Sequence, residues 1–375
     1  MPPLPRPQLH LPPQLRRAVV VGAGSFGTAV AVLLARGGMR TTLQTRTRAQ
    51  ADVLSETREN REYLPGVELP RELRIEPMAN GLARAELVFL AVPSLGVGEV
   101  IAGLEQAGLT RRAAVVSLAK GLVPPDGTPP TALLRARLGA SRVACIGGPA
   151  HAQEMVAHGA GLVAASSDEA LASQLAATFI RAGVVCEQSN DPVGVELAGA
   201  AKNAAALAAG ATEAQGLNAA GAAAGHIFAE VWRYAERLGA RPESMIGLAG
   251  TGDLVATALA PQSRNRRAGE LLARGVPASE IPAQIGQAVE SLESVPLLAR
   301  ALAGAGIEAP VNDALRRLIA GELPLDEWVA LVRATVPPPA RWRERRREGA
   351  GGGWRPAWDR VRGWFSAPSR DAGER

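Results

Sequence analysis

Short apolar runs alternate with helical patterns along the first 190 residues of the chain. Runs rich in valine, leucine and alanine that end at glycine, proline or a polar residue are typical of strands buried in a parallel sheet. Residues 18–21, 40–45, 73–76, 86–92, 113–118, 143–147, 162–165 and 184–186 are predicted strands, residues 28–36, 49–59 and 97–107 are predicted helices, and residues 63–66 are a predicted turn. The alternation predicts a Rossmann-type, doubly wound α/β sheet, whose ligands bind at the carboxyl ends of the strands.

The pattern becomes helical near residue 190 and gives no convincing strand beyond it. Helices are predicted at residues 193–211, 219–238, 242–245, 266–273, 282–285, 294–303 and 311–320. We therefore expect a disordered arm at residues 1–15, a dinucleotide-binding domain at 16–190, a mainly α-helical substrate and catalytic domain at 191–336, and a disordered tail at 337–375. A substrate pocket is expected where the two domains meet.

The first predicted strand leads into a glycine-rich turn and then into a helix. Gly22, Gly24 and Gly27 have the spacing G-x-G-x-x-G. In a dinucleotide-binding loop, the first glycine makes the tight turn, the second leaves room for a pyrophosphate, and the third lets helix and strand pack closely. The free N–H groups at the helix N-terminus attract the phosphates. An ordinary glycine-rich turn is the alternative, and the strand–turn–helix context disfavours it.

The end of the second predicted strand bears on the choice of cofactor. NAD sites usually carry Asp or Glu there, about 20 residues after the glycines, where the carboxylate binds the ribose. This chain has Arg46 and Arg48 at that place and no carboxylate. A guanidinium suits a 2′-phosphate, so the sequence favours NADP(H), with NAD(H) as the second choice. The alternative is that both arginines are solvated surface charges.

Charge and cysteine content exclude several classes of protein. The net charge of +5 belongs to the tail, because residues 341–375 hold ten Arg against five Asp or Glu. It therefore gives no reason to expect a nucleic-acid-binding core. Cys145 and Cys186 lie in separate apolar runs without disulfide or metal-ligand spacing, so we expect a reducing cytoplasm and no metal site. The proline-rich start lacks the apolar segment of a signal peptide, and the alanine-rich stretch at 198–225 is too polar for a membrane span.

Lysine usage points to candidate chemistry. Of the 41 basic side chains, only Lys120 and Lys202 are lysines. Arginine stays protonated, whereas the pKa of a buried lysine can fall far enough for the side chain to exchange a proton. Lys120 follows a predicted strand end, and Lys202 lies among small residues of a long helix, where it is a candidate general acid or base. The alternatives are chance and a packed structural lysine.

Two polar stretches of the helical half add to this chemistry. A glycine-rich turn at residues 247–252 presents Asp253. Ser263, Arg264 and Asn265 stand beside a helix start and form a donor cluster suited to a phosphate ester. An N-cap at Asp253 and a solvated basic helix start are the alternatives, and each is the better interpretation when its stretch is taken alone.

Taken together, these motifs resemble those of the bacterial-type NAD(P)-dependent glycerol-3-phosphate dehydrogenase family. The resemblance covers about residues 16–336. It depends on the dinucleotide loop with Ser25-Phe26 and on motifs at residues 119–121, 148–149, 201–203, 252–254, 263–266 and 286–290. It implies a cytoplasmic oxidoreductase that interconverts sn-glycerol 3-phosphate and dihydroxyacetone phosphate and feeds phospholipid synthesis. A homodimer is compatible with it.

The resemblance also implies roles for individual residues. The cofactor would contact, besides the three glycines, Ser25, Phe26, Arg46, Arg48, Tyr63, Lys120, Ala152, Arg264, Ala288 and Glu290. The substrate would contact Lys120, Gly148, Ala150, Lys202, Asp253, Ser263, Arg264 and Asn265. Lys202 would be the proton donor and acceptor. The family usually has Ser or Thr in place of Ala150, so one hydroxyl contact is missing and only the backbone can serve there.

Two rival functions fit parts of the sequence. A β-hydroxyacid or ketoacid reductase would share the two-domain plan, but the Ser-Arg-Asn cluster at residues 263–265 favours a phosphorylated substrate. A cofactor-sensing binding protein without turnover would share the dinucleotide loop. Binding alone gives no reason to retain two lysines in a chain that otherwise uses arginine.

The tail contains a short amphipathic pattern at residues 354–365. Trp354, Trp358, Val361 and Phe365 fall at i, i+4, i+7 and i+11, and arginines occupy other faces. A basic helix with an aromatic face suits an anionic membrane surface or a groove on a partner protein. A proline and a glycine within this short segment weaken the helix, and a functionally silent tail is the favoured alternative.

Overall fold

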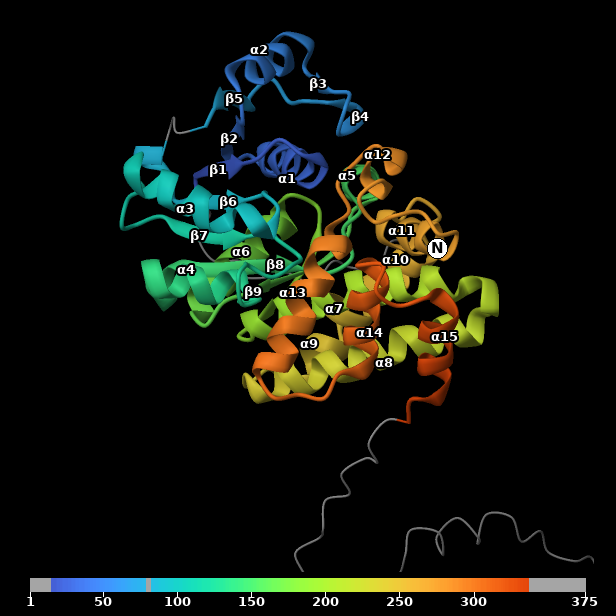
Figure 1. Ribbon diagram of the computed structural model, residues 1–375. Helices are drawn as coiled ribbons and strands as arrows, with labels where there is room; N and C mark the ends of the chain where they lie inside the picture. The colour runs from blue at the N-terminus through green and yellow to red at the C-terminus, as the bar shows by residue number, and fades with distance from the viewer. Residues whose placement is uncertain (1–14, 79–81, 337–375) are drawn as a thin grey trace, which may run out of the picture. The chain divides into compact units, whose positions relative to one another are not determined.

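Among residues 15–78 and 82–336, which the computed structural model describes, an eight-stranded sheet forms the framework of the first half of the chain (Figure 1). The strand order is β10-β9-β8-β7-β6-β1-β2-β5. The strands are β1 (Arg17–Val21), β2 (Arg40–Thr45), β5 (Arg74–Pro77), β6 (Leu87–Leu90), β7 (Ala114–Ser117), β8 (Val143–Gly147), β9 (Gly161–Ala165) and β10 (Val185–Ser189). The predicted strands are confirmed, with ends that shift by a few residues.

The sheet reverses direction between β8 and β9. These two strands pair antiparallel, β9 and β10 pair parallel, and the other neighbours are parallel. The connection contains α5 (Ala152–His158), a helix of 7 residues. Such a helix spans about 10 Å, whereas a five-residue strand spans about 16 Å. The chain therefore enters β9 from the edge at which it left β8, a reversal that the alternating pattern does not predict.

Helices cover both faces of this sheet. One face packs against α1 (Ser25–Arg36), α2 (Arg48–Thr57), α5 and α6 (Glu169–Arg181) in one apolar cluster. The other face packs against α3 (Val97–Gln106) and α4 (Pro130–Leu138) in a second cluster. This is the predicted doubly wound arrangement, and it places the carboxyl ends of β1, β6, β7 and β8 along one edge.

A two-stranded ladder replaces the predicted end of the second helix. α2 ends at Thr57 because Arg58 adopts the left-handed conformation, with a φ of 51°. The chain continues as β3 (Glu59–Asn60), which pairs antiparallel with β4 (Leu64–Glu68). The predicted helix is therefore wrong at residues 58 and 59, and the predicted turn is right at Tyr63 but wrong at 64–66, which belong to β4.

Every named element that the structure describes beyond Ser189 is helical, as the pattern predicts (Figure 1). The α-helices are α7 (Pro192–Thr212), α8 (Leu217–Arg237), α9 (Pro242–Ile246), α10 (Asp253–Leu259), α11 (Arg264–Ala273), α12 (Ile281–Ile285), α13 (Glu290–Gly304), α14 (Pro310–Ile319) and α15 (Leu325–Ala334). The sequence pattern did not single out α10 or α15. A wide π-helical turn, η5 (Leu248–Gly252), leads into α10.

α7 is the central helix of this half. It is buried at nearly every position and packs against α8, α10, α11 and α13, as well as β8. Small side chains allow this close packing, most clearly where α7 crosses α11. A Cβ on Gly210 would lie 2.1 Å from the Arg266 carbonyl oxygen, and a Cβ on Gly269 would lie 2.1 Å from the Leu207 carbonyl oxygen. The two backbones therefore touch, and only glycine fits at either position.

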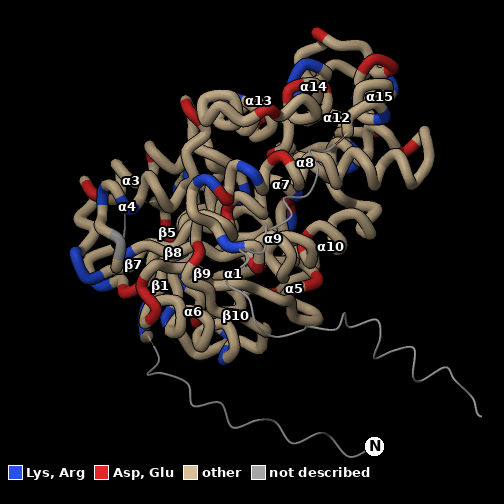
Figure 2. The backbone as a smooth tube through the Cα atoms, turned by 90° about the horizontal axis from the view of Figure 1, so that it is seen from below, with Lys and Arg blue, Asp and Glu red and all other residues tan. Residues whose placement is uncertain are grey.

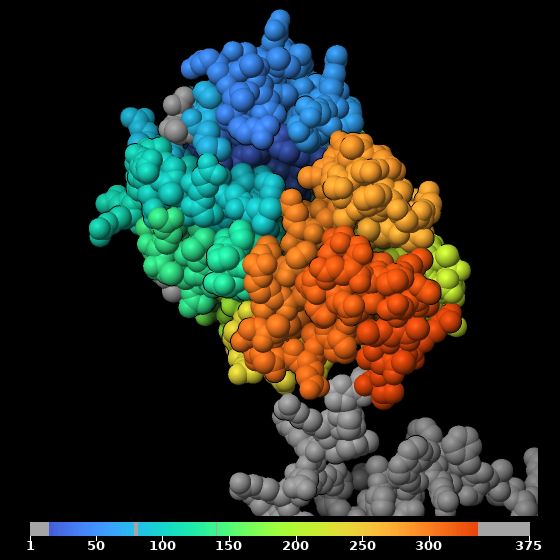
Figure 3. Space-filling model, viewed as in Figure 1, coloured from blue at the N-terminus to red at the C-terminus, as the bar shows by residue number. Residues whose placement is uncertain are grey.

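The helical half also contacts the sheet half through α13. The Arg300 guanidinium donates a hydrogen bond of 2.6 Å to the Pro125 carbonyl oxygen. On the face shown in Figure 3, the orange surface of residues around 290–300 adjoins the teal to green surface of the sheet half. Figure 2 shows Lys and Arg interspersed with Asp and Glu along the described backbone, as the balanced charge outside the tail implies.

Two predicted segments lie outside the described residues: the arm at residues 1–15, apart from its last residue, and the tail at 337–375 with its amphipathic pattern. The described residues all belong to one unit, Met1–Val336. None of the helices in the described ranges combines the length and the apolarity that crossing a bilayer requires.

We predict that Gly269→Ala destabilises the protein by about 1–3 kcal/mol, because the new methyl group would enter the backbone of α7. The control is Gly221→Ala on the exposed side of α8, where an added Cβ meets nothing within 4 Å. That variant should gain about 0.5–1 kcal/mol from helix propensity. Urea denaturation of both variants checks the prediction, and a Gly269→Ala protein as stable as the wild type would contradict the close crossing.

Candidate active site

The loop from β1 to α1 lies at the carboxyl end of a central strand and holds the three glycines. Gly22 has a φ of +110°, and a Cβ there would lie 2.4 Å from the Ala91 carbonyl oxygen. A Cβ on Gly27 would lie 2.1 Å from the Gly22 carbonyl oxygen. An added Cβ on Gly24 meets nothing within 4 Å, so this position faces open space. The loop therefore combines two tight contacts with room for a phosphate at the start of α1, which begins at Ser25 rather than at the predicted residue 28.

A buried asparagine fixes this loop from the β3–β4 ladder. The Asn60 side-chain amide donates hydrogen bonds of 2.9 Å to the Ala23 carbonyl oxygen and 2.8 Å to the Thr28 hydroxyl. The sequence assigned no role to Asn60. A single polar residue in a short ladder has no periodic signal, and only the tertiary contact identifies it.

Arg46 and Arg48 follow β2, the strand next to β1. Both are exposed, and within the described residues neither forms an ion pair with a carboxylate. Tyr63 lies close by: its hydrogen bond to Glu62 raises the pKa of the phenol, and the positive charge of Arg46 opposes that shift. The structure thus brings Arg46 and Tyr63 together beside the glycine loop, where a guanidinium is available to an anionic ligand.

Lys120, Lys202 and Asp253 form a charged cluster at the centre of the described unit. Lys120 Nζ lies 2.6 Å from Asp253 Oδ2 and donates a second hydrogen bond of 2.9 Å to the Gly148 carbonyl oxygen. Lys202 Nζ lies 3.6 Å from the same carboxylate oxygen. Asp253 is only 1% exposed and Lys202 only 7%. The two lysines of the chain, one from the residues after β7 and one from α7, thus share one buried carboxylate from α10.

Burial and the neighbouring charges set the protonation states of this cluster. Burial, helped by the positive charge of Lys120, lowers the pKa of Lys202 to about 8 against the opposing charge of Asp253. Burial alone would raise the pKa of Asp253, but the charges of Lys120 and Lys202 outweigh it and lower that pKa. Asp253 therefore stays ionised, while Lys202 can gain or lose a proton near neutral pH.

Asp253 reaches the two lysines because of the wide turn before it. A Cβ on Gly250 would lie 1.9 Å from the Met245 carbonyl oxygen, so this turn depends on glycine. Asp253 is the first residue of α10 and does not cap it, so the N-cap alternative is wrong. Thr257, one turn later on the same helix face, has a buried hydroxyl without a hydrogen-bond partner in the described part of the protein. It was missed from the sequence, although its i+4 spacing from Asp253 was a usable signal.

A chain of amide side chains connects this cluster to the starts of α11 and α13. Asn203 Nδ2 donates hydrogen bonds of 3.0 Å to the Lys120 carbonyl oxygen and 3.1 Å to Glu290 Oε2. Asn265 Nδ2 in turn donates a hydrogen bond of 2.8 Å to Asn203 Oδ1. Asn203 lies beside Lys202 in the helix, and the sequence analysis assigned it no role of its own.

The predicted phosphate cluster lies at the start of α11. Ser263 is the N-cap of this helix, and its hydroxyl accepts a hydrogen bond of 3.4 Å from the Arg266 N–H. The Ser263 hydroxyl therefore has a structural role as the cap of this helix, which the sequence analysis did not assign. Arg264 is exposed and donates a hydrogen bond of 3.1 Å to the Ala288 carbonyl oxygen, which brings it to the stretch before Glu290. Arg264 and Asn265 thus lie between the charged cluster and this stretch.

The residues after β8 approach the cluster from the sheet. A Cβ on Gly148, which has a φ of +100°, would lie 2.3 Å from the Gly161 carbonyl oxygen. Ala150 and Ala152 are half-buried, and Ala152 starts α5. His151 lies between them. Burial is the main cause that lowers the pKa of its imidazole, and the charges of the cluster act on it more weakly. Because Ala150 has no hydroxyl, only backbone groups can donate or accept at that position.

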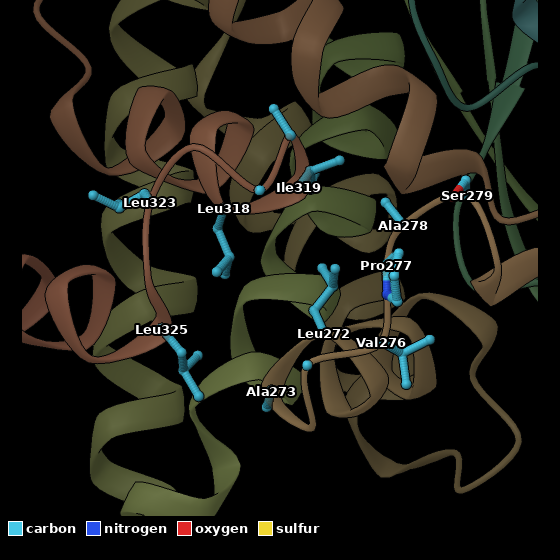
Figure 4. Close-up of a pocket in the computed structure, with 13 residues that line it drawn as sticks. Leu272, Ala273, Val276, Pro277, Ala278, Ser279, Leu318, Ile319, Leu323 and Leu325 are labelled. Carbon is cyan, nitrogen blue, oxygen red and sulfur yellow. The ribbon is translucent and has the colours of Figure 1, made fainter.

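An apolar hollow of about 570 Å³ lies elsewhere, between the end of α11 and the turn from α14 to α15 (Figure 4). Leu272, Val276, Leu318 and Leu323 are among its lining residues, and none of the thirteen carries an ionisable side chain. It therefore offers no group for proton transfer, and the charged cluster is the better candidate for chemistry.

Comparison with known proteins places this geometry in one family. The family model described as the N-terminus of NAD-dependent glycerol-3-phosphate dehydrogenase matches residues 17–172, and the model of the C-terminus matches residues 191–330. The glycerol-3-phosphate dehydrogenase [NAD(P)+] of Deinococcus radiodurans is 42% identical over 310 residues, which cover 81% of this chain and 90% of the relative. The enzyme of the same name from Thermus thermophilus is 40% identical over 308 residues, which cover 80% of this chain and 93% of the relative.

A solved structure agrees with these matches. The crystal structure of a glycerol-3-phosphate dehydrogenase from Coxiella burnetii has a TM-score of 0.80 and 29% sequence identity, and covers 85% of this chain and 99% of that chain. The similarity therefore extends over the sheet half and the helical half alike.

The charged cluster predicts how Lys202 titrates when its partner is neutralised. Asp253→Asn removes the carboxylate that raises the pKa of Lys202, so this pKa should fall below its value of about 8. Acylation of each lysine can be followed against pH by mass spectrometry, which is simple in a chain with two lysines. The control is Glu230→Gln, which alters a buried carboxylate on α8 that accepts from the Val311 and Asn312 N–H groups. An unshifted Lys202 midpoint in Asp253→Asn would contradict the coupling.

Proposed function

Because the chain belongs to the NAD-dependent glycerol-3-phosphate dehydrogenase family, and is thus an NAD(P)-dependent oxidoreductase, we propose that Lys202 is its proton donor and acceptor in the interconversion of sn-glycerol 3-phosphate and dihydroxyacetone phosphate. The observation that carries this proposal is the buried cluster of the only two lysines around Asp253. Burial lowers the pKa of Lys202 to about 8, which suits a group that must both give and take a proton.

The open space at Gly24 and the tight contacts of Gly22 and Gly27 fit a dinucleotide at the start of α1. We propose that this loop, with Ser25, Phe26 and the Arg46 region, holds the cofactor, and that Ala152, Arg264, Ala288 and Glu290 contact it from the other elements. When bound, the nicotinamide cofactor supplies or accepts the hydride at the keto carbon. The ring of Phe26 lies 5.9 Å from Lys120 Nζ, so the cofactor loop adjoins the charged cluster.

The substrate would lie against the cluster with its phosphate toward α11. We propose that Ser263, Arg264 and Asn265 bind the phosphate, and that the Gly148 and Ala150 backbone lines the other side. Remote binding of the phosphate orients the keto carbon, because interactions away from the reacting atoms hold the substrate in place. This requirement for a phosphate distinguishes the proposal from a plain ketoacid reductase.

In reduction, negative charge grows on the carbonyl oxygen as the hydride arrives. Lys202 would donate its proton to that oxygen, and the positive charge of Lys120 would stabilise it. Asp253 keeps both ammonium groups in one small site by offsetting their repulsion. In oxidation the same lysine, now neutral, would take the hydroxyl proton. We extend the proposal to a supply of glycerol 3-phosphate for phospholipid synthesis, which rescue of a glycerol 3-phosphate auxotroph would test.

The proton-transfer role predicts a large loss of turnover in Lys202→Arg, which keeps the charge but cannot release a proton. We expect kcat for dihydroxyacetone phosphate to fall about 10²-fold or more, with an unchanged circular dichroism spectrum. In the wild type, kcat/KM for reduction should fall as the pH rises through about 8, and for oxidation it should rise over the same range. Lys120→Arg should lose less, since its role requires only charge. Near-normal turnover in Lys202→Arg would reject the role.

The cofactor preference predicts a selective effect of Arg46→Asp. The aspartate would repel a 2′-phosphate and accept a hydrogen bond from a 2′-hydroxyl, so KM should rise more for NADPH than for NADH. Steady-state kinetics with both cofactors measure this. The matched control is Arg40→Asp, an exposed arginine at the other end of the same strand, which should change neither value. Equal losses for the two cofactors in Arg46→Asp would rule out the preference.

A further inference from the structure

We propose that Glu196, a buried residue of α7, is a positioning residue that fixes Lys120 by holding the end of the segment that carries it. This inference rests on the proposed contribution of Lys120 to the reaction. The segment in question, here called the Lys120 segment, runs from the end of β7 to the start of α4, at residues 118–129.

The Lys120 segment begins at the sheet but is held by the helical half. α7 contacts it with residues at i, i+3 and i+7, which share one face of the helix. Glu196 bonds to Thr131 just beyond the segment, Gly199 faces the Lys120 stem, and Asn203 bonds to the Lys120 carbonyl oxygen. A Cβ on Gly199 would lie 3.5 Å from Lys120 Cβ. The same helix carries Lys202. α7 therefore positions Lys202 directly and positions Lys120 through the face that holds Glu196, Gly199 and Asn203.

α13 holds the segment from a second side, again with residues at i, i+3 and i+7. A Cβ on Gly121 would lie 3.6 Å from Ser294 Cβ, and a Cβ on Gly127 would lie 2.5 Å from the Leu297 carbonyl oxygen and 2.9 Å from Ala301 Cβ. On the neighbouring turn, Arg300 bonds to the Pro125 carbonyl oxygen. The segment is therefore confined between two helices, and Glu196 closes its far end.

The contact between Glu196 and Thr131 is a strong one. The Thr131 N–H lies 3.0 Å and 3.1 Å from the two carboxyl oxygens, and the Thr131 hydroxyl lies 2.6 Å from Oε2. Thr131 is in the first turn of α4, where a carboxylate is favoured by the free N–H groups of the helix. Burial disfavours the charged form of Glu196 and raises its pKa to about 8. Burying an acid costs free energy of folding. The bonds from Glu196 to Thr131 therefore serve to fix how α7 and α4 align rather than to add stability.

Positioning matters here because Lys120 has little tolerance for displacement. Its ammonium group is bonded at 2.6 Å to Asp253 and at 2.9 Å to the Gly148 carbonyl oxygen. A movement of the segment by about 1 Å would lengthen both bonds, and misplacement of this size can cost up to about 10²-fold in rate.

The test is a double-mutant cycle between Glu196→Ala and Lys120→Ala. We expect Glu196→Ala to lower kcat/KM for dihydroxyacetone phosphate about tenfold while KM for NADPH changes less than twofold. In the Lys120→Ala background the same change should have almost no effect, because the residue it positions is gone. Glu196→Gln keeps an acceptor oxygen for the Thr131 N–H and should restore activity to within about threefold of wild type.

The control is Glu230→Ala, which removes an equally buried carboxyl that bonds to the first turn of α14. This variant should lose stability but keep kcat/KM. If Glu196→Ala fails to fold, Thr131→Val takes its place in the cycle, since it removes the hydroxyl that lies 2.6 Å from Glu196 Oε2. Equal losses with and without Lys120 would overturn the positioning role and leave the proposed reaction standing. An unaffected Lys120→Ala single variant would instead overturn the role of Lys120 in the reaction, and this inference with it.

Discussion

The structure depends on one buried carboxylate, that of Asp253, which pairs with two lysines. Asp253 accepts a hydrogen bond from the ammonium group of Lys120, in the sheet half, and lies within ion-pair distance of Lys202, in the helical half. Two positive charges so close together and so little hydrated would repel each other without it. The wide turn before α10, the small residues of α7 and the hydrogen bonds of Asn203 all serve to bring these three groups to one point. The charged cluster is therefore a constraint on the fold as well as a candidate for chemistry.

The helices around the charged cluster have small side chains, which lets them pack close to it. α7 is made almost entirely of alanine and glycine around Lys202, and the backbone of α11 touches it where Gly210 and Gly269 cross. Small residues contribute little apolar area each, but they allow several helices to surround one helix. The consequence is a rigid support in which Lys202 and Asn203 are held by packing from every side.

Much of this could be predicted from the sequence, because the strongest signals are local. Apolar runs marked the strands, the glycine spacing marked the loop after β1, and the scarcity of lysine singled out both lysines of the charged cluster. The failures have physical reasons. The left-handed turn at Arg58 is a property of one backbone angle, and the reversal at β9 depends on the length of a short helix. Asn60, Asn203 and Glu196 are single polar residues whose partners lie far away in the chain, so no pattern reveals them.

The reversal of β9 and β10 also determines where along the chain Lys202 must stand. Because β10 runs against β8, it ends at the edge of the sheet opposite the glycine loop, and α7 must start there and run back beside β8. Contacts from Pro192 to Cys145 and from Val195 to Gly147 follow this path. Val195 lies at the last residue of β8, and Lys202 comes seven residues later, which is about two turns and about 10 Å of helix. Lys202 therefore stands on nearly the same side of α7 as the residue that contacts β8, and one residue inserted between Val195 and Lys202 would turn Lys202 by about 100° and away from Asp253.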